Sequence, residues 1–257
     1  MDARRLGRAG PAVSPIGFGA FKIGRNVGIK YPQGYELPDE QQVSALLHGV
    51  LDLGINYIDT APAYGSSEQW IGRVLASRRD EFVLSSKVGE TFEDGQSTYD
   101  FSADAVDASL QRSLERLGTD RLDAVFIHSN GEREEDFARS GAVASLRRAR
   151  ERGVVNAIGL SAKTIQGARS ALDWADVLMV EYHLNDRSFE PILVSAVDRG
   201  VGIVCKKGLA SGHLSPIEAI RFVLRQPAIA SLVVGSLNLA HLEQNLRGAG
   251  CAGMGEG

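Results

Sequence analysis

The feature that most constrains the fold is a regular alternation of short apolar runs with amphipathic segments. Eight runs rich in β-branched residues recur along the chain, and none alternates strictly between apolar and polar residues. They cover residues 16–20, 55–59, 82–87, 122–128, 154–160, 177–182, 201–206 and 231–234. Such runs predict strands that are buried on both faces, as they are in a parallel sheet.

The segments between these runs have the spacing of amphipathic helices. One apolar face is formed by Val43, Leu46, Leu47, Val50 and Leu51. Further along, Ser102 is predicted to cap the N-terminus of a helix that Gly118 ends. The segment Ser215-Pro216-Ile217-Glu218 predicts a capping box with proline at the first helical position.

Strands that alternate with helices in this way predict one domain over residues 1–257, a closed (β/α)₈ TIM barrel. An open doubly wound sheet has the same local pattern and is the alternative. We expect a small hairpin before residue 16 and loops at 25–38 and 90–100. The Gly-rich segment 248–257 is expected to be a flexible tail.

Charge and cysteine content narrow the classes of function. The formal net charge is −4 and no basic stripe is present, so we expect no nucleic-acid partner. Cys205 and Cys251 have the spacing of neither a metal site nor a disulfide framework. No apolar stretch approaches the ~18 residues of a membrane span, and the N-terminus lacks the apolar core of a signal peptide. A cytoplasmic protein with no membrane partner is therefore expected.

Polar side chains stand where three neighbouring strands are predicted to end. Asp59, Lys87 and His128 close the second, third and fourth runs, and Tyr64 follows Asp59 by five residues. Each alone has a structural explanation, such as a turn cap or a lysine that reaches solvent. Catalytic groups of barrel enzymes gather at the C-terminal strand ends, so together the four predict a site.

Longer motifs around these residues resemble those of the aldo-keto reductases. The segment IDTAPAYGSSEQWIG at 58–72 is similar to the family signature, in which Asp-Thr-Ala precedes Tyr-Gly-x-Ser-Glu. LSSKV at 84–88 and VFIH at 125–128 resemble the strands that end in the family's active-site lysine and histidine. AIGLS at 157–161 resembles its fifth strand, and the segment from 233 to 245 resembles its cofactor-phosphate segment.

The resemblance implies a carbonyl oxidoreductase that uses NADP(H), with NAD(H) as the alternative. A hydride that attacks a carbonyl carbon builds negative charge on the oxygen, and Tyr64 would protonate it as general acid. We expect the Lys87 ammonium to lower the pKa of Tyr64 and Asp59 to keep that ammonium charged. His128 would donate a hydrogen bond to the carbonyl oxygen.

The resemblance also implies a set of cofactor-binding positions. They are Gly19, Ala20, Asp59, Ser161, Met179, Lys206, Lys207, Gly208, Leu209, Gly235, Ser236, Asn238, Gln244 and Asn245. The chain departs from the family at Ala162, which replaces an asparagine, at Met179, which replaces a glutamine, and at 206–209, where an aromatic residue usually stacks on the nicotinamide. Ser236 and His241 stand where a basic clamp often holds the 2′-phosphate, so we expect a modest preference for NADPH over NADH.

The loops that would enclose a substrate are short, which predicts weak and broad binding of a small carbonyl compound. The aromatic candidates to line the pocket are Phe21, Trp70, Phe92 and Phe101. The acidic stretch 132–136 predicts a solvated helix start. We expect a monomer or a weak homo-oligomer.

Two other functions stay open beside reduction. The reverse reaction would make the chain an NAD(P)⁺-dependent aldose or sugar dehydrogenase. A nicotinamide-binding regulatory barrel with little turnover is the second, because the carboxamide pocket is altered. The complete set of Asp59, Tyr64, Lys87 and His128 argues against that regulatory function.

Overall fold

The computed structural model describes residues 3–8, 10–29 and 31–250. Its centre is a closed barrel of parallel strands in which each barrel strand pairs with the next along the chain. In order they are β3 (Ile16–Gly19), β4 (Tyr57–Asp59), β5 (Val83–Val88), β8 (Leu122–His128), β9 (Val155–Ser161), β10 (Val177–Glu181), β11 (Gly202–Lys206) and β12 (Ile229–Val234). β12 returns to β3, with Leu232 paired to Ile16. This closure confirms the predicted barrel and excludes the open sheet.

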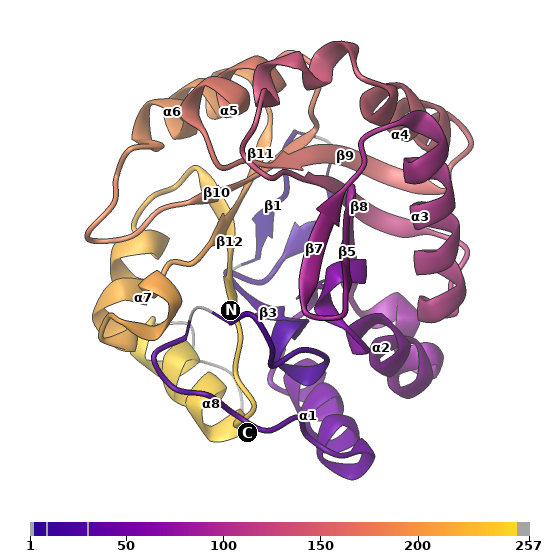
Figure 1. The fold of residues 1–257 in the computed structure, drawn as a ribbon. Coiled ribbons are helices and arrows are strands. Elements are labelled where there is room, and N and C mark those ends of the chain that lie inside the picture. The colour runs from indigo at the N-terminus through magenta and orange to yellow at the C-terminus, as the bar shows by residue number, and fades with distance from the viewer. Residues whose placement is uncertain (1–2, 9, 30, 251–257) are drawn as a thin grey trace.

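Helices surround the barrel on its outside (Figure 1). They are α1 (Glu40–Asp52), α2 (Ser67–Leu75), α3 (Ala103–Leu117), α4 (Gly141–Glu151), α5 (Ile165–Ala171), α6 (Glu190–Arg199), α7 (Pro216–Leu224) and α8 (Leu239–Gly248). The predicted apolar face of α1 is buried at all its positions. Helix faces of this kind pack on the outward side chains of the strands, so the strands are buried on both faces.

The predicted helix ends are partly confirmed. The Ser102 hydroxyl accepts a hydrogen bond from the Ala105 N–H, and Gly118 ends α3 in the left-handed region at φ 60°. Ser215 precedes α7, but its hydroxyl makes no cap bond, so the predicted capping box is wrong. The serines Ser102 and Ser140, by contrast, do cap α3 and α4 with their hydroxyls.

The floor of the barrel is sealed by the predicted N-terminal hairpin. Its strands are β1 (Arg4–Arg5) and β2 (Ala12–Val13). Leu6 and Val13 join one apolar cluster with inward side chains of the barrel, including Phe126 and Val204. Arg4 ties the hairpin down by donating to the carbonyl oxygens of Leu224 and Ile229, both at 2.7 Å. The packed floor leaves the opposite end of the strands for a site.

A second hairpin corrects the prediction of a loop at 90–100. β6 (Glu90–Glu93) and β7 (Gln96–Tyr99) pair in antiparallel fashion beside the barrel mouth. Asp94 and Gly95 connect them with φ of 50° and 80°. An Asp-Gly pair with positive φ at both residues is typical of a tight hairpin turn, because its twist matches that of the strands.

The C-terminal prediction is tested only in part. Gly248 is the last residue of α8, and residues 251–257 of the predicted tail lie outside the described residues. Over the portion that is described, none of the helices combines the length and the apolar character needed to cross a bilayer.

Candidate active site

Every barrel strand contributes to one cavity of about 680 Å³ at the C-terminal ends of the strands. The strand-end residues that line it are Gly19, Asp59, Lys87, His128, Ser161, Glu181, Lys206 and Val234. Tyr64 joins them from the short 3₁₀-helix η2 (Pro62–Tyr64) that follows β4. The structure therefore brings all four predicted catalytic residues to the rim of one cavity.

Lys87 and Asp59 form a buried ion pair. The Lys87 Nζ donates to the two Asp59 carboxylate oxygens at 2.8 and 2.7 Å and to the Thr60 carbonyl oxygen at 2.8 Å. The exposed fractions of the two side chains are 1% and 4%. Burial lowers the pKa of Lys87, and the Asp59 carboxylate opposes that shift. An ammonium has three donors, and all three have acceptors here.

A chain of hydroxyl groups fixes the Asp59 carboxylate from inside the barrel. The Ser85 hydroxyl donates to Asp59 Oδ1 at 2.8 Å, and the Tyr57 hydroxyl donates to Ser85 Oγ at 2.9 Å. Tyr57 and Ser85 are fully buried. In the parallel pairing of β4 with β5, Asp59 lies opposite Ser85, so the strand register brings the Ser85 hydroxyl to the Asp59 carboxylate. Sequence reasoning missed both residues, although Ser85 precedes Lys87 by two and shares its face of the strand.

Tyr64 lies close to the ion pair. The Lys87 Nζ is 4.7 Å from the centre of the Tyr64 ring. Burial raises the pKa of Tyr64 well above its usual value, and the Asp59 carboxylate raises it further. This direction is opposite to the expected lowering by Lys87. The reason is that the ammonium is neutralised by Asp59 at close range, while burial of the phenol disfavours its anion.

His128 is positioned by Glu90, a residue that the sequence analysis did not identify. The Nδ1 of His128 lies 2.7 Å from Glu90 Oε2. The Ser97 hydroxyl of β7 donates to Glu90 Oε1 at 2.6 Å. One carboxylate oxygen therefore contacts His128 and the other is held by the hairpin. Burial raises the pKa of Glu90, but His128 and Ser97 lower it more, to about 2. Burial lowers the pKa of His128. The Asp-Gly turn at 94–95 was the available signal for this hairpin.

The predicted cofactor positions divide into two groups. Those that line the cavity are Gly19, Asp59, Ser161, Met179, Lys206, Lys207, Gly208, Leu209 and Gly235. Ala20, Ser236, Asn238, Gln244 and Asn245 do not line it. The Ser236 hydroxyl is bonded within its own turn, and Asn238 caps α8 through the Ala240 N–H. The roles of both groups in binding stay predictions.

Two glycines let neighbouring strand ends pack closely at the rim. A Cβ added to Gly19 would lie 2.7 Å from Val233 Cγ1, and one added to Gly235 would lie 3.3 Å from the Gly19 carbonyl oxygen. Both glycines line the cavity beside Ser161 and Lys206, so backbone and polar groups face it together. These residues fit the polar carboxamide of a nicotinamide.

The aromatic lining differs in part from the prediction. Phe21 lines the cavity, together with Tyr31, Tyr99 and Phe189, whereas Trp70, Phe92 and Phe101 do not. Phe21 packs edge-on against Tyr64, with ring centres 5.0 Å apart. Trp70 packs partly buried against the core outside the barrel, as its helical spacing favoured.

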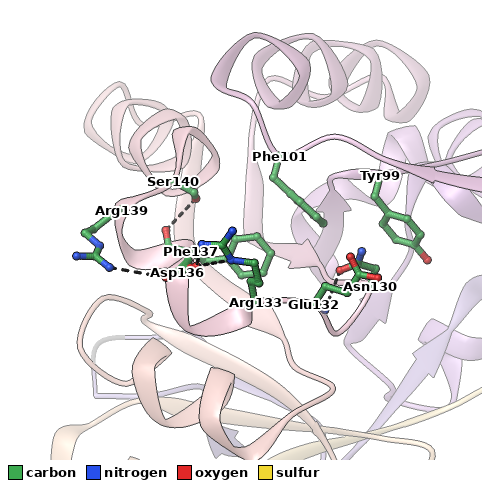
Figure 2. Close-up of a pocket in the computed structure, with 9 residues that line it drawn as sticks. All are labelled: Tyr99, Phe101, Asn130, Glu132, Arg133, Asp136, Phe137, Arg139 and Ser140. Atoms are coloured by element: carbon green, nitrogen blue, oxygen red, sulfur yellow. Dashed lines mark hydrogen bonds and ion pairs between the residues drawn. The ribbon is translucent and has the colours of Figure 1, made fainter.

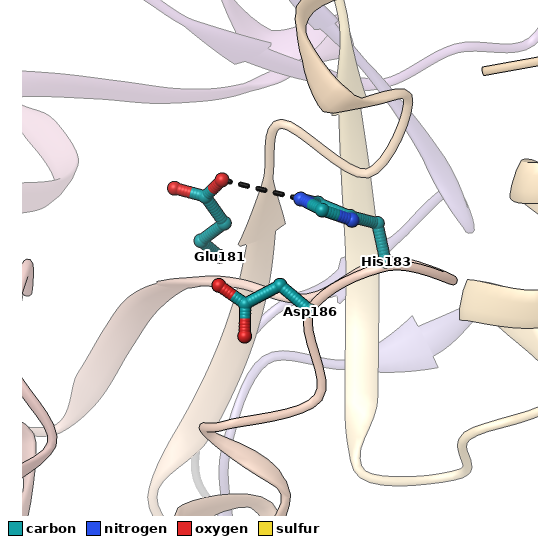
Figure 3. A group of neighbouring side chains, drawn as sticks. All are labelled: Glu181, His183 and Asp186. Atoms are coloured by element: carbon teal, nitrogen blue, oxygen red, sulfur yellow. Dashed lines mark hydrogen bonds and ion pairs between the residues drawn. The ribbon is translucent and has the colours of Figure 1, made fainter. Parts of the chain in front are cut away.

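Two neighbouring features lie apart from the four catalytic candidates. A second cavity of about 610 Å³ is lined by Phe101 and Phe137 with several charged residues, and it shares Tyr99 with the first (Figure 2). Glu181, His183 and Asp186 form a compact polar group at the end of β10 and in the turn that follows it (Figure 3). His183 Nε2 lies 3.2 Å from Glu181, and its Nδ1 accepts from the Asn185 N–H, so this group is satisfied internally.

The acidic stretch is not wholly solvated, which corrects that prediction. Glu134, in η4 (Glu134–Arg139), is 1% exposed. Its carboxylate accepts hydrogen bonds from the Lys163 and Thr164 N–H groups, both at 2.8 Å, and from the Thr164 hydroxyl at 2.6 Å. It therefore links η4 to the start of α5 beside the cavity.

Comparison with known proteins agrees with this geometry. Residues 15–218 match the model of the Aldo/keto reductase family. The D-threo-aldose 1-dehydrogenase of Pseudomonas sp. is 27% identical over 92% of this chain and 89% of its own length, and the L-galactose dehydrogenase of Arabidopsis thaliana is 30% identical over 96% and 87%. A solved aldo-keto reductase structure from Pseudomonas aeruginosa superposes with a TM-score of 0.88 at 42% identity, over 96% of this chain and 94% of that one.

Proposed function

Because this chain belongs to the aldo/keto reductase family, we propose that it reduces aldehyde, ketone or sugar carbonyls with a hydride from NADP(H) or NAD(H). The observation that carries this proposal is the arrangement at the cavity rim, where Tyr64 and His128 face the space above the buried Lys87–Asp59 pair. Packing alone gives no reason to bury an ion pair beneath a tyrosine at a barrel mouth.

A carbonyl oxygen beside Tyr64 would meet the phenol as its hydrogen-bond donor. The His128 ring lies at 85° to the Tyr64 ring with centres 6.0 Å apart. Because Glu90 faces Nδ1, the Nε2 of His128 is the atom turned to the substrate, and it donates to a carbonyl oxygen only in the doubly protonated ring. Donors fixed in advance around a developing oxyanion lower the barrier without reorganisation.

Proton donation by Tyr64 does not require a lowered pKa. A bound reduced nicotinamide would supply the hydride, and an alkoxide is far more basic than a phenolate. A buried phenol with a raised pKa stays protonated at neutral pH and so keeps the proton that the alkoxide takes. Asp59 and Thr60 hold the Lys87 ammonium in place beside the Tyr64 ring.

Ser161, Lys206 and Gly235 are proposed to hold the nicotinamide end of the cofactor, and the start of α8 its phosphates. Ser161 is nearly fully buried and its hydroxyl faces the Lys206 amine at 2.9 Å. Gln244 is exposed on α8 and Asn245 is buried beneath it, so only the former is free to meet an adenine without rearrangement.

Oxidation of aldoses is the second candidate, and the relatives favour it. Two of them are named for dehydrogenation of sugars, D-threo-aldose and L-galactose. The same four residues would serve the reverse direction, in which the tyrosinate that accepts the proton forms only as the pH rises toward the raised pKa of Tyr64.

Absorbance of the reduced nicotinamide tests the proposal directly. The protein is assayed with NADPH or NADH and a panel of small aldehydes and ketones, and with the oxidised cofactors and a panel of aldoses. We expect turnover in at least one direction and a cofactor preference below ~1000-fold, which corresponds to ~4 kcal/mol. Tight cofactor binding without turnover on either panel would contradict the enzyme proposal and favour a regulatory barrel.

A further inference from the structure

The cavity is unusually rich in amines. The chain has six lysines, and the cavity lining includes Lys22, Lys87, Lys163, Lys206 and Lys207. The Lys22 Nζ lies over the rings of Tyr31 and Tyr35, 4.2 and 5.2 Å from their centres, and such contacts favour the charged ammonium. Lys87 is fully engaged by Asp59 and Thr60, and the Lys207 amine is paired with Glu181. An amine held by a carboxylate keeps its proton and is not a nucleophile.

Lys206 has a neutral partner instead. Its Nζ donates to the Ser161 hydroxyl at 2.9 Å, and within the described ranges no carboxylate is bonded to it. Lys206 ends β11 beside Glu181 of β10 and lines the cavity. The Glu181 carboxylate is paired with Lys207. It also contacts His183, as Figure 3 shows. The amine is therefore in the carbonyl cavity without a counter-ion of its own.

The charges around Lys206 favour its neutral form. Burial lowers the pKa of the Lys206 amine to about 7, and the adjacent Lys207 and the Lys87 ammonium lower it as well. Glu134 and Glu181 oppose this shift. His128 also faces the amine, and it stays neutral because burial lowers its own pKa. A desolvated lysine next to a second cation is the arrangement that activates an amine for attack on carbonyl groups.

We propose that Lys206 is a nucleophilic amine that condenses reversibly with aldehydes in the barrel mouth. The nitrogen lone pair forms a bond to the aldehyde carbon and gives a carbinolamine. The carbon–oxygen bond then breaks, and the two nitrogen protons leave with that oxygen as one water molecule, so that a neutral imine remains. The Ser161 hydroxyl accepts a Lys206 N–H, and it lies where it can pass a proton from nitrogen to oxygen.

This imine uses the cavity of the proposed reductase but needs no nicotinamide. It gives the protein a way to retain small aldehydes, open-chain aldoses included, independently of hydride transfer. Ketones would react less because their carbonyl carbon is more hindered. The proposal can therefore fail or succeed separately from the proposed function.

Reductive trapping in the absence of nicotinamide tests it. The intact protein is incubated with propionaldehyde and cyanoborohydride, which reduces imines but not free aldehydes, and N-propylated lysines are located by peptide mass spectrometry. At pH 7.5 we expect Lys206 to react more than tenfold faster than Lys207, because the Lys207 amine is engaged by the Glu181 carboxylate. The rate at Lys206 should level off above about pH 7.

Three variants make the test specific. Lys206→Arg keeps a cation but cannot form an imine, so it should lose the fast label, while Lys207→Arg should keep it. Ser161→Ala should slow labelling of Lys206 several-fold. Equal labelling of Lys206 and Lys207, or a rate at Lys206 that still rises toward pH 10, would overturn the proposal. If the parent protein shows no turnover with nicotinamide cofactors while propionaldehyde still labels Lys206, the result would count against the proposed reductase but not against the imine.

Discussion

At the scale of single residues, the site depends on the contact between Asp59 and Lys87. Both side chains are buried, and the pair survives because every donor of the ammonium has an acceptor and Asp59 receives a further bond from Ser85. Desolvation of two charges costs free energy, and the attraction between the charges offsets that cost only while both partners are present. Removal of one partner leaves the other charge buried and alone.

Asp59→Asn should therefore destabilise the protein strongly. We expect a loss of about 3–5 kcal/mol in the free energy of unfolding, measured by chemical denaturation. The matched control is the double variant Asp59→Asn with Lys87→Met, which removes the stranded ammonium and should recover part of the loss. A decrease below about 1 kcal/mol in the single variant would mean that Lys87 finds another counter-charge.

At the scale of elements, two carboxylates outside the barrel strands fix the rim. Glu90 begins β6 and holds His128, while Glu134 begins η4 and holds the start of α5. Neither was identified from sequence. Glu90 lies 38 residues before His128, and Glu134 lies 29 residues before Lys163, so nothing local in the sequence pairs them.

Glu134→Gln tests the second of these contacts. Glutamine keeps one acceptor oxygen but loses the charge, and hydrogen bonds to a charged group contribute about 1.5–3 kcal/mol. We expect the free energy of unfolding to fall by about 1–3 kcal/mol. Glu135→Gln is the control, because Glu135 is exposed and its change should stay within about 0.5 kcal/mol. Equal changes in the free energy of unfolding for the two substitutions would show that the buried hydrogen bonds of Glu134 do not stabilise the fold.

Strand ends, by contrast, could be predicted from local patterns. Asp59, Lys87 and His128 each follow an apolar run that can only be a strand, and parallel strands present their ends at one rim. The orientation of Tyr64 and the direction of its pKa could not be predicted, because they depend on how closely Asp59 neutralises Lys87. The hairpin at 90–99 was missed although its Asp-Gly turn is a local signal.

At the scale of the whole molecule, the barrel is a rigid support with titratable groups at one end. The pKa of Glu90 is about 2 in the folded protein, against 4.5 for a free side chain, and the pKa of His128 is also lowered. Both groups bind fewer protons when folded than when unfolded. Stability is therefore fully present above about pH 6.5 and is lost as the pH falls from there toward 2.

The free energy of unfolding should accordingly decline between pH 6.5 and pH 3. Glu90 contributes a loss in the free energy of unfolding on the order of 3 kcal/mol. This loss is complete once the pH has fallen from 4.5, the pKa of the free side chain, to about 2, its pKa in the folded protein. Denaturation curves at several pH values measure this decline. In Glu90→Gln the acid limb below pH 4.5 should flatten, and an unchanged limb would assign the acid sensitivity to other groups.

The most direct measurement on the central proposal is the steady-state rate of Tyr64→Phe, which removes only the hydroxyl above the Lys87–Asp59 pair. General acid catalysis is worth about 10²–10⁴ in rate, so kcat for reduction of the best aldehyde should fall by that factor. Cofactor binding, followed by nicotinamide fluorescence, should change less than about twofold, which also shows that the variant is folded. A kcat within tenfold of the parent would contradict Tyr64 as the proton donor.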